Sequence, residues 1–165
     1  MDCNFNDYIT KYSLDLTRLC LSLCGNRADA DDLFQDTWYK AMKNYSKYNR
    51  ALPFDKWLFA ICVNTYKNNV KLAFNCRNVS FTNDEEKMRF LNSIPDITEK
   101  NCDDYIMLHT AIQKLDKKRR IVLVLFYFKD YSIKEISEIL KIPEGTVKSR
   151  LYSAKSELKR SMCYE

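Results

Sequence analysis

The stretch that decides the fold reads YSIKEISEILKIPEGTVKSRL and occupies residues 131–151. Ser132 is followed three residues later by Glu135, which is the spacing of a capping box. In a capping box each of the two side chains accepts a hydrogen bond from the other residue's backbone amide, and this fixes the start of a helix. Together with the apolar residues that recur after Glu135, the spacing predicts a short helix over residues 133–140.

A tight turn and a longer helix follow this short helix. The tripeptide Lys141-Ile142-Pro143 predicts the turn, since proline is favoured at or just before the first turn of a helix. Apolar residues at steps of four, three and four then predict a helix to about Arg160, with a core-facing stripe of Val147, Leu151, Ala154 and Leu158. A short helix, a turn and a longer basic helix form the helix-turn-helix layout, whose second helix enters the major groove of DNA.

The other side of the second helix carries polar and basic side chains. Those placed to meet base edges are Lys148, Ser149, Tyr152 and Ser153. Those placed to reach phosphates are Arg150, Lys155, Lys159 and Arg160. Residues 141–160 hold 6 basic and 2 acidic side chains, a net charge of +4. A basic helical hairpin without a ligand is the alternative, and the capping box, the turn and the charge together disfavour it.

The whole chain has the composition of a folded, mainly helical protein. Its 165 residues are 46% hydrophobic and 30% charged, with only 2 glycines and 3 prolines. Sandwiches and barrels need many turn residues, and phosphate-binding loops need glycine clusters, so the sequence predicts an all-α fold. The N-terminus does not resemble a signal peptide and no run of about 18 apolar residues occurs, so a cytoplasmic protein is expected.

Charge is distributed unevenly along the chain. Residues 1–75 carry a net charge of +2, residues 76–104 a net of −3 and residues 105–165 a net of +6. An acidic middle between more basic ends is typical of two nucleic-acid-facing lobes around a tether. An uneven solvated surface is the alternative that charge alone leaves open.

Two amphipathic helices are predicted in the first part of the chain. Apolar residues at steps of three and four predict a helix over residues 5–24, which Gly25 ends. The next helix begins near Ala28 with aspartates in its first turn, where the helix dipole favours negative charge. Its predicted core stripe is Phe34, Trp38, Ala41 and Tyr45. Its opposite face carries Asp32, Gln35, Asp36, Tyr39 and Lys43.

A loop over residues 46–53 and a helix over residues 54–74 come next. Aromatic rings provide stacking faces for unpaired bases and cations follow the backbone of a single strand, so this region is a candidate site for opened nucleic acid. Its aromatic residues are Tyr45, Tyr48, Phe54, Trp57 and Tyr66, and its polar residues include Arg50, Lys56, Asn64, Lys67, Asn68 and Lys71. Burial of the aromatic residues in a core is the alternative, and composition leaves both interpretations open.

The middle of the chain loses its apolar periodicity. Residues 75–100 predict a linker that holds at most a short helix near residues 84–92. Periodicity returns from about Asp103, and the apolar run over residues 121–128 suits either a strand or a helix core. Asp116 offers an N-cap before this run, and the sequence shows no partner strand, so a helix is favoured.

Seven cysteines at irregular spacing make a poor disulfide framework. Cys20 and Cys24 lie one helical turn apart and could in principle hold a metal ion. The sequence offers no second pair at ligand spacing, and its only histidine, His109, is far away. Small apolar core residues are the favoured interpretation, so no metal and no cofactor are predicted. A cysteine-based redox or zinc sensor is a further functional hypothesis.

Three segments resemble the bacterial extracytoplasmic-function (ECF) sigma factors, and together they cover most of the chain. DADDLFQDTW, residues 29–38, resembles the family's core-polymerase-binding helix. LPFDKWL, residues 52–58, resembles the loop and helix start that melt and read the −10 element, and residues 131–151 resemble the −35-reading helix-turn-helix. The resemblance implies region 2 over residues 1–74, a linker over residues 75–102 and region 4 over residues 103–165.

The resemblance implies a promoter-specificity subunit of RNA polymerase and not an enzyme. The implied partners are core RNA polymerase, promoter DNA (duplex at −35, single-stranded at −10) and an anti-sigma factor, often membrane-bound. Polymerase contacts would come from Asp32, Gln35, Asp36 and Tyr39. Contacts to the −10 strand would come from Asn49, Arg50, Trp57, Asn64, Lys67, Asn68 and Lys71. Contacts to the −35 duplex would come from Thr146, Lys148, Ser149, Arg150, Tyr152, Ser153 and Lys155. A helix-turn-helix regulator that acts without polymerase is the alternative.

The helix-turn-helix departs from the family pattern at two positions. Ser137 stands where the family often has alanine, and Lys141 stands in the turn where glycine is common. A lysine with a positive φ costs roughly 1–2 kcal/mol because its Cβ crowds the backbone.

Overall fold

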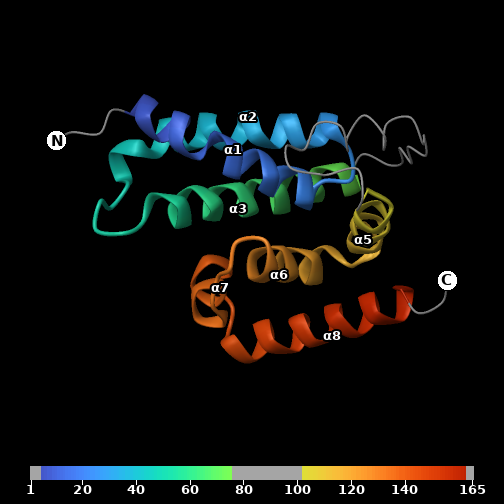
Figure 1. Ribbon diagram of the computed structural model, residues 1–165. Helices are drawn as coiled ribbons and strands as arrows, with labels where there is room; N and C mark the ends of the chain where they lie inside the picture. Colours follow the sequence, from blue (N-terminus) through green and yellow to red (C-terminus); the bar gives the residue numbers. More distant parts are fainter. Residues whose placement is uncertain (1–4, 76–101, 163–165) are drawn as a thin grey trace. The chain divides into compact units, whose positions relative to one another are not determined.

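The computed structural model describes residues 5–75 and 102–162. Within these ranges the chain has seven α-helices, one short 3-10 helix and no strand (Figure 1). The helices form two compact units, one before and one after residues 76–101. The all-α prediction is confirmed, whereas most of the predicted linker, with its short helix near residues 84–92, lies outside the described residues.

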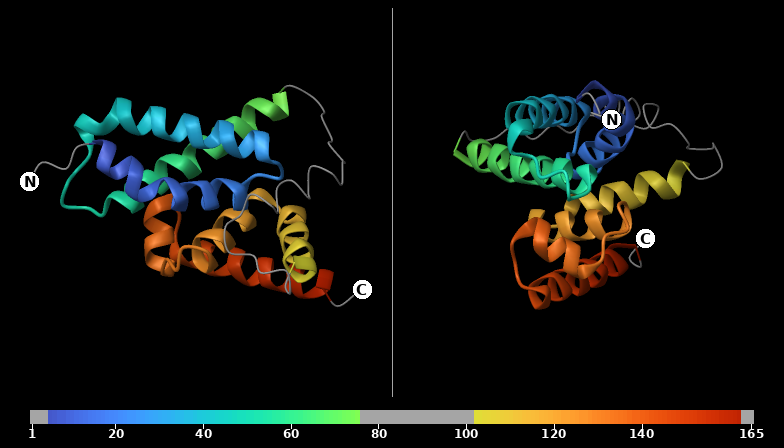
Figure 2. Two further views of the ribbon diagram at one scale, coloured as in Figure 1. Left: turned by 45° about the horizontal axis from the view of Figure 1, so that its top comes forward. Right: turned by 90° about the vertical axis from the view of Figure 1, so that its left-hand side faces the viewer.

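The first unit packs three long helices around one apolar core. Helix α1 spans Phe5–Leu23, α2 spans Arg27–Asn44 and α3 spans Phe54–Asn75, and the 3-10 helix η1 spans Tyr45–Lys47. Figures 1 and 2 show the three α-helices side by side, and each contacts the other two. The helices bury mainly leucine side chains in this core, among them Leu16, Leu19, Leu23, Leu33 and Leu58.

Helix α2 starts one residue before the predicted Ala28 and buries a wider stripe than predicted. The Asn26 side chain caps it by accepting a hydrogen bond from the Asp29 amide at 2.8 Å. Trp38 and Ala41 are buried as predicted, but Phe34 and Tyr45 are only half-buried. Leu33 and Thr37 complete the buried stripe, and the Thr37 hydroxyl donates to the Leu33 carbonyl at 2.6 Å.

An aromatic cluster closes the end of the unit where α3 begins. Its centre is Phe54, which is only 3% exposed. The Tyr8 ring stacks on Phe54 at a centroid distance of 4.0 Å, and the Tyr12 ring lies 5.5 Å away. Tyr48 and Trp57 contact Phe54 at 5.3 Å and 5.4 Å. The cluster therefore joins α1, the loop after η1 and the first turn of α3.

The second unit consists of four helices. Helix α5 spans Cys102–Lys114, α6 spans Lys117–Tyr127, α7 spans Ile133–Leu140 and α8 spans Glu144–Met162. The apolar run over residues 121–128 forms most of α6, which buries the consecutive residues from Ile121 to Leu125. The helical interpretation of this run is therefore confirmed. Neither α6 nor any other described helix is long and apolar enough to cross a membrane.

The turn between α5 and α6 is held by an arginine. Asp116 is the N-cap residue of α6 as predicted, but its side chain makes no capping hydrogen bond. Its carbonyl accepts the first backbone bond of the helix from the Arg120 amide at 2.8 Å. The buried Arg120 guanidinium donates to the carbonyl oxygens of Ile112 and Leu115, at 3.2 Å and 3.1 Å, and to that of Gln113. These carbonyls lie at and just after the C-terminal end of α5, where a helix leaves its last carbonyls without intrahelical partners, and that of Ile112 also accepts from the Leu115 amide at 3.2 Å.

The helix-turn-helix forms as the sequence predicts. Ser132 Oγ accepts from the Glu135 amide at 3.3 Å, and the Glu135 carboxylate accepts from the Ser132 amide at 2.8 Å, so the capping box is complete. Lys141 ends α7 with φ of 55°. The Ile142 amide donates to the Ser137 carbonyl at 3.1 Å, and the Ser137 hydroxyl donates back to the Ile142 carbonyl at 2.6 Å. The strained lysine therefore lies in a turn with an additional side-chain bond.

Candidate nucleic-acid interface

The outward face of α8 is defined by what the opposite face buries. Val147, Leu151 and Ala154 are buried in the contacts that α8 makes with the other helices of the second unit. This packing leaves Lys148, Ser149 and Tyr152 exposed on the N-terminal half of the helix, with Tyr152 75% exposed, and Ser153 half-buried. The structure therefore brings together the four side chains that the sequence assigns to base edges.

A hydrogen bond joins Thr146 and Ser149 at the start of α8. Thr146 is half-buried, and its carbonyl accepts a hydrogen bond from the Ser149 hydroxyl at 3.0 Å. The proton of Ser149 is therefore engaged by the helix backbone. Its oxygen lone pairs remain available, so Ser149 is placed to accept a hydrogen bond from a base amino group.

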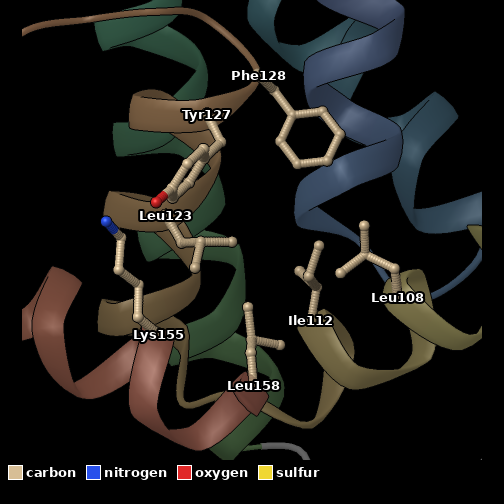
Figure 3. Close-up of a pocket in the computed structure, with 7 residues that line it drawn as sticks. All are labelled: Leu108, Ile112, Leu123, Tyr127, Phe128, Lys155 and Leu158. Atoms are coloured by element: carbon tan, nitrogen blue, oxygen red, sulfur yellow. The ribbon is translucent and has the colours of Figure 1, made fainter. Parts of the chain in front are cut away.

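The basic residues of α8 do not all project in the same way. Lys159 and Arg160 are exposed and Arg150 is half-buried. The Lys155 ammonium lies 5.2 Å from the centre of the Tyr127 ring (Figure 3). It lies 5.8 Å from the centre of the Phe126 ring. This cation–π contact holds Lys155 against α6, so Lys155 is placed less well for a phosphate than Lys159.

Lys155 forms the rim of an apolar groove within the second unit (Figure 3). The groove has a volume of about 400 Å³ and is lined by Leu108, Ile112, Leu123, Tyr127, Phe128, Lys155 and Leu158. Leu158 was predicted as a core residue of α8, but it is only half-buried because it lines this groove. The aromatic rings of Tyr127 and Phe128 are exposed beside it.

The polar face of α2 separates into an exposed part and a part that contacts α3. Asp32, Gln35 and Tyr39 are exposed, and Tyr39 is 60% exposed. Met42 is exposed next to them, and the sequence analysis missed it because methionine is normally assigned to a core. Asp36 instead is half-buried and accepts a hydrogen bond from the Asn69 side-chain amide of α3 at 3.2 Å. Asp36 is thus oriented toward α3.

Hydrogen bonds between residues 48 and 52 shape the loop between η1 and α3. The Tyr48 hydroxyl donates to the Leu52 carbonyl at 2.5 Å, and the Leu52 amide donates to the Asn49 carbonyl at 3.0 Å. The Ala51 amide donates to the side-chain oxygen of Asn49 at 3.0 Å. Asn49 and Arg50 are exposed at the tip. Because the Asn49 oxygen is engaged, its amino group is the part that can donate to a base.

The aromatic residues of this region are not equivalent. Phe54 and Tyr66 are buried, so for these two the core alternative is correct and they offer no face to a base. Trp57 is half-buried and its ring lies 4.9 Å from Tyr48. Burial raises the pKa of Tyr48, so its hydroxyl keeps the proton that it donates to Leu52.

Helix α3 presents amide and basic side chains after this aromatic start. Asn64 and Asn68 are exposed one turn apart, and Lys67 beside them is half-buried. Lys71 belongs to the same helix, but its side chain lies outside the described residues. Three residues of the predicted −10 face therefore lie within about one turn of each other on α3.

The cysteines near this face are packing residues. Cys20, Cys24 and Cys62 are buried free thiols, and the sulfur atoms of Cys20 and Cys62 lie 3.8 Å apart. The hydrogen bond to Cys62 and burial hold the pKa of Cys20 above its ordinary value. Across residues 5–75 and 102–162, no three histidine, cysteine or acidic side chains gather in a way that could hold a metal ion.

These features define an all-α protein with a helix-turn-helix unit and a separate three-helix unit, and comparison with known proteins assigns each unit. Residues 8–72 match the model of sigma-70 region 2, and residues 105–158 match that of sigma-70 region 4. The ECF RNA polymerase sigma factor SigL of Mycobacterium tuberculosis is 32% identical over 149 residues, covering 89% of this chain and 82% of SigL. SigW of Bacillus subtilis is 27% identical over 165 residues, covering 96% of this chain and 88% of SigW.

The chain belongs to the ECF sigma factor family, whose members bind core RNA polymerase and direct transcription initiation at specific promoters. Two solved structures share its fold. One is the sigma factor RpoE of Bartonella quintana in complex with the anti-sigma factor NepR, with a TM-score of 0.77 and 18% identity over 98% of both chains. The other is CnrH in complex with the cytosolic domain of CnrY, with a TM-score of 0.69 and 20% identity over 98% of this chain and 88% of CnrH.

Proposed function

We propose that this sigma factor divides its work among three surfaces. Helix α8 reads the −35 duplex, the loop at residues 48–53 with the polar face of α3 holds the opened −10 strand, and the exposed face of α2 docks on core polymerase. The domain limits that go with this division lie near residues 74 and 103. The polar face of α8, exposed by the burial of its apolar stripe, is the observation that carries the proposal.

The −35 contact rests on charge as well as shape. Residues 105–165 carry 13 basic and 7 acidic side chains. Phosphate contacts supply most of the salt-dependent affinity of a DNA-binding domain, while contacts to base edges supply specificity. Lys148, Ser149 and Tyr152 are placed for base edges, and Lys159 and Arg160 are placed for phosphates.

The polymerase contact is proposed for the exposed part of α2. Asp32, Gln35 and Tyr39 offer a carboxylate, an amide and a large ring, and Met42 extends this surface by one turn. Tyrosine and methionine are enriched at protein interfaces, whereas isolated exposed carboxylates contribute less. We therefore assign Tyr39 the largest share of the affinity, and Asp36 a role in holding α3.

An anti-sigma partner is also proposed. Two proteins of the same fold were solved as complexes, one with the anti-sigma factor NepR and one with the cytosolic domain of CnrY. An inhibitor that binds this chain would fit both, and the cytosolic domain named for CnrY is the observation that favours a membrane-bound one. Purification of the chain from its host with a tag, followed by identification of the bound protein, tests this partner.

Reconstituted transcription tests the main proposal. Core polymerase with this chain should give a defined run-off product on some member of a genomic promoter library, and core polymerase alone should not. Tyr39→Ala should lower core binding at least about tenfold, as expected for a central interface aromatic, while Lys11→Ala, an exposed position on α1, serves as the control. Duplex binding without any effect of polymerase would instead identify a helix-turn-helix regulator.

A further inference from the structure

The loop at residues 48–53 has one feature that its place in the sequence does not explain. The hydroxyl of Tyr48, the first residue of the loop, donates a hydrogen bond to the carbonyl of Leu52 at 2.5 Å. This bond spans residues 49–51 and closes the loop. The two other bonds of the loop, from the Leu52 amide to the Asn49 carbonyl and from the Ala51 amide to the Asn49 side chain, are local turn contacts. The Tyr48 bond differs from these two because it comes from a ring that packs in the folded body of the first unit.

The Tyr48 ring is itself anchored. Its centroid lies 4.9 Å from Trp57, 5.3 Å from Phe54 and 6.3 Å from Tyr45. Phe54 is buried at the centre of the aromatic cluster. A bond from a ring that is packed on the first turn of α3 fixes the loop in relation to that helix. The exposed amides of Asn64 and Asn68 lie farther along the same helix.

The fixed loop displays a short row of exposed side chains. Asn49 and Arg50 are polar, and Leu52 is apolar and 56% exposed. Both backbone polar groups of Leu52 are engaged, its amide by Asn49 and its carbonyl by Tyr48. Its side chain is thereby held toward solvent. Apolar side chains of this kind contact base faces or the thymine methyl group in protein–DNA complexes.

We propose that Tyr48 is a positioning residue for the opened-strand site, and that its hydroxyl holds Leu52 and the tip of the loop in the conformation that contacts an unpaired base. This inference rests on the proposed assignment of the loop to the −10 strand. An ordered loop does not have to lose conformational freedom when the strand binds, so part of the cost of binding is already met by folding. Without the hydroxyl the loop has to become ordered when the strand binds, so the affinity for the strand should be lower.

A conservative variant isolates this role. Tyr48→Phe keeps the ring and its packing and removes only the donor to Leu52. Tyr12→Phe is the matched control, since its ring also packs on Phe54 at 5.5 Å but the hydrogen bonds between residues 48 and 52 do not involve it. Leu52→Ala removes the side chain that the bond is proposed to position. Thermal unfolding of each variant reports whether the first unit stays folded.

The measurement uses holoenzyme assembled from core polymerase and the full chain, on a promoter found by run-off transcription. A non-template −10 oligonucleotide labelled with 2-aminopurine reports strand binding, and a −35 duplex with a fluorescent end label reports duplex binding. We expect Tyr48→Phe to weaken strand binding by about three- to tenfold, the effect of one hydrogen bond. Leu52→Ala should act in the same direction. The −35 affinity and the core affinity should match those of Tyr12→Phe.

The possible outcomes distinguish the role of Tyr48 from the assignment of the loop to the −10 strand. If the wild-type holoenzyme does not bind the −10 strand, the assignment of the loop fails and the role of Tyr48 fails with it. If wild type binds and Tyr48→Phe binds equally well, only the role of Tyr48 is overturned. Equal losses of strand and −35 affinity in Tyr48→Phe would show a general structural effect and would also overturn it.

Discussion

Ser137 and Ile142 exchange two hydrogen bonds across the turn of the helix-turn-helix. The Ser137 hydroxyl donates to the Ile142 carbonyl at 2.6 Å, and the Ile142 amide donates to the Ser137 carbonyl at 3.1 Å. Between them Lys141 adopts the left-handed conformation that glycine favours. The two departures from the family pattern therefore belong together: the hydrogen bond of the Ser137 hydroxyl offsets part of the backbone strain at Lys141.

Substitutions at these two positions should have opposite effects on stability. Ser137→Ala should lower the free energy of unfolding of the second unit by about 1 kcal/mol because it removes one partly buried hydrogen bond. Lys141→Gly should raise it by about 0.5–1 kcal/mol, the strain relieved less the entropy cost of glycine. Urea unfolding followed by circular dichroism measures both. A stabilising effect of Ser137→Ala would contradict the assignment of the bond.

Two adjacent arginines provide a matched pair for a second prediction. Arg120 is buried and donates to the carbonyl oxygens of Ile112, Gln113 and Leu115, so Arg120→Met should cost about 2–3 kcal/mol by removing the donor to the Gln113 and Leu115 carbonyls and one of the two donors to that of Ile112. Arg119 pairs with Glu157, but the side chains are 41% and 42% exposed, so Arg119→Met should cost at most about 1 kcal/mol. Urea unfolding measures the stability of both variants. Equal losses in the free energy of unfolding would show that Arg120 does not anchor this turn.

Base reading and phosphate contact on α8 can be separated by sequence dependence. Lys148→Ala should change the preference at one −35 base position by about 1–3 kcal/mol. Lys159→Ala should weaken all sequences alike and lower the salt slope of binding by about one unit. Fluorescence anisotropy with a set of single-base −35 variants measures both effects. Sequence-independent losses in both variants would contradict the placement of Lys148 at a base edge.

The buried thiol of Cys20 predicts a response to alkaline pH. Its hydrogen bond to Cys62 and its burial raise its pKa above the ordinary 9.0, so the unfolded chain releases this proton at a lower pH than the folded chain. The stabilisation is fully present below the ordinary value and is lost as the pH rises toward the folded pKa. The free energy of unfolding should fall by about 1 kcal/mol between pH 8 and pH 9.5.

The control for this pH effect is Cys20→Ala. That variant should be less stable at neutral pH because of the smaller side chain, yet its stability should decline less between the two pH values. Parallel declines in the variant and the wild type, measured by urea unfolding at both pH values, would assign the effect to other groups.

Local signals explain why some elements were predictable from the sequence. The capping box, the turn and the apolar spacing of residues 131–151 lie within a few residues of each other, and the structure reproduces α7 with its predicted bounds. A helix could be favoured for α6 but not established from the sequence, because a continuous apolar run shows neither the helical nor the strand periodicity. Asp116 shows the limit: its position as N-cap is correct, but its side chain makes no capping hydrogen bond.

Contacts between distant residues account for most of what the sequence analysis missed. Nothing local indicates that Asp36 bonds Asn69, which lies 33 positions away, or that Lys155 lies over the rings of α6. Arg120 was not recognised because an arginine is normally assigned to the surface. The outward residues of α8 could be assigned because burial of one stripe on a helix determines the opposite face.

The hydrogen bonds between α2 and α3 have a mechanical consequence for the first unit. Besides Asp36 and Asn69, the Lys40 ammonium bonds the Thr65 hydroxyl at 3.2 Å, so two rungs connect the antiparallel helices one turn apart. Sliding of one helix along the other would break both rungs together. A displacement of α2 along its axis is therefore expected to carry α3 with it, because both hydrogen bonds oppose sliding of the two helices.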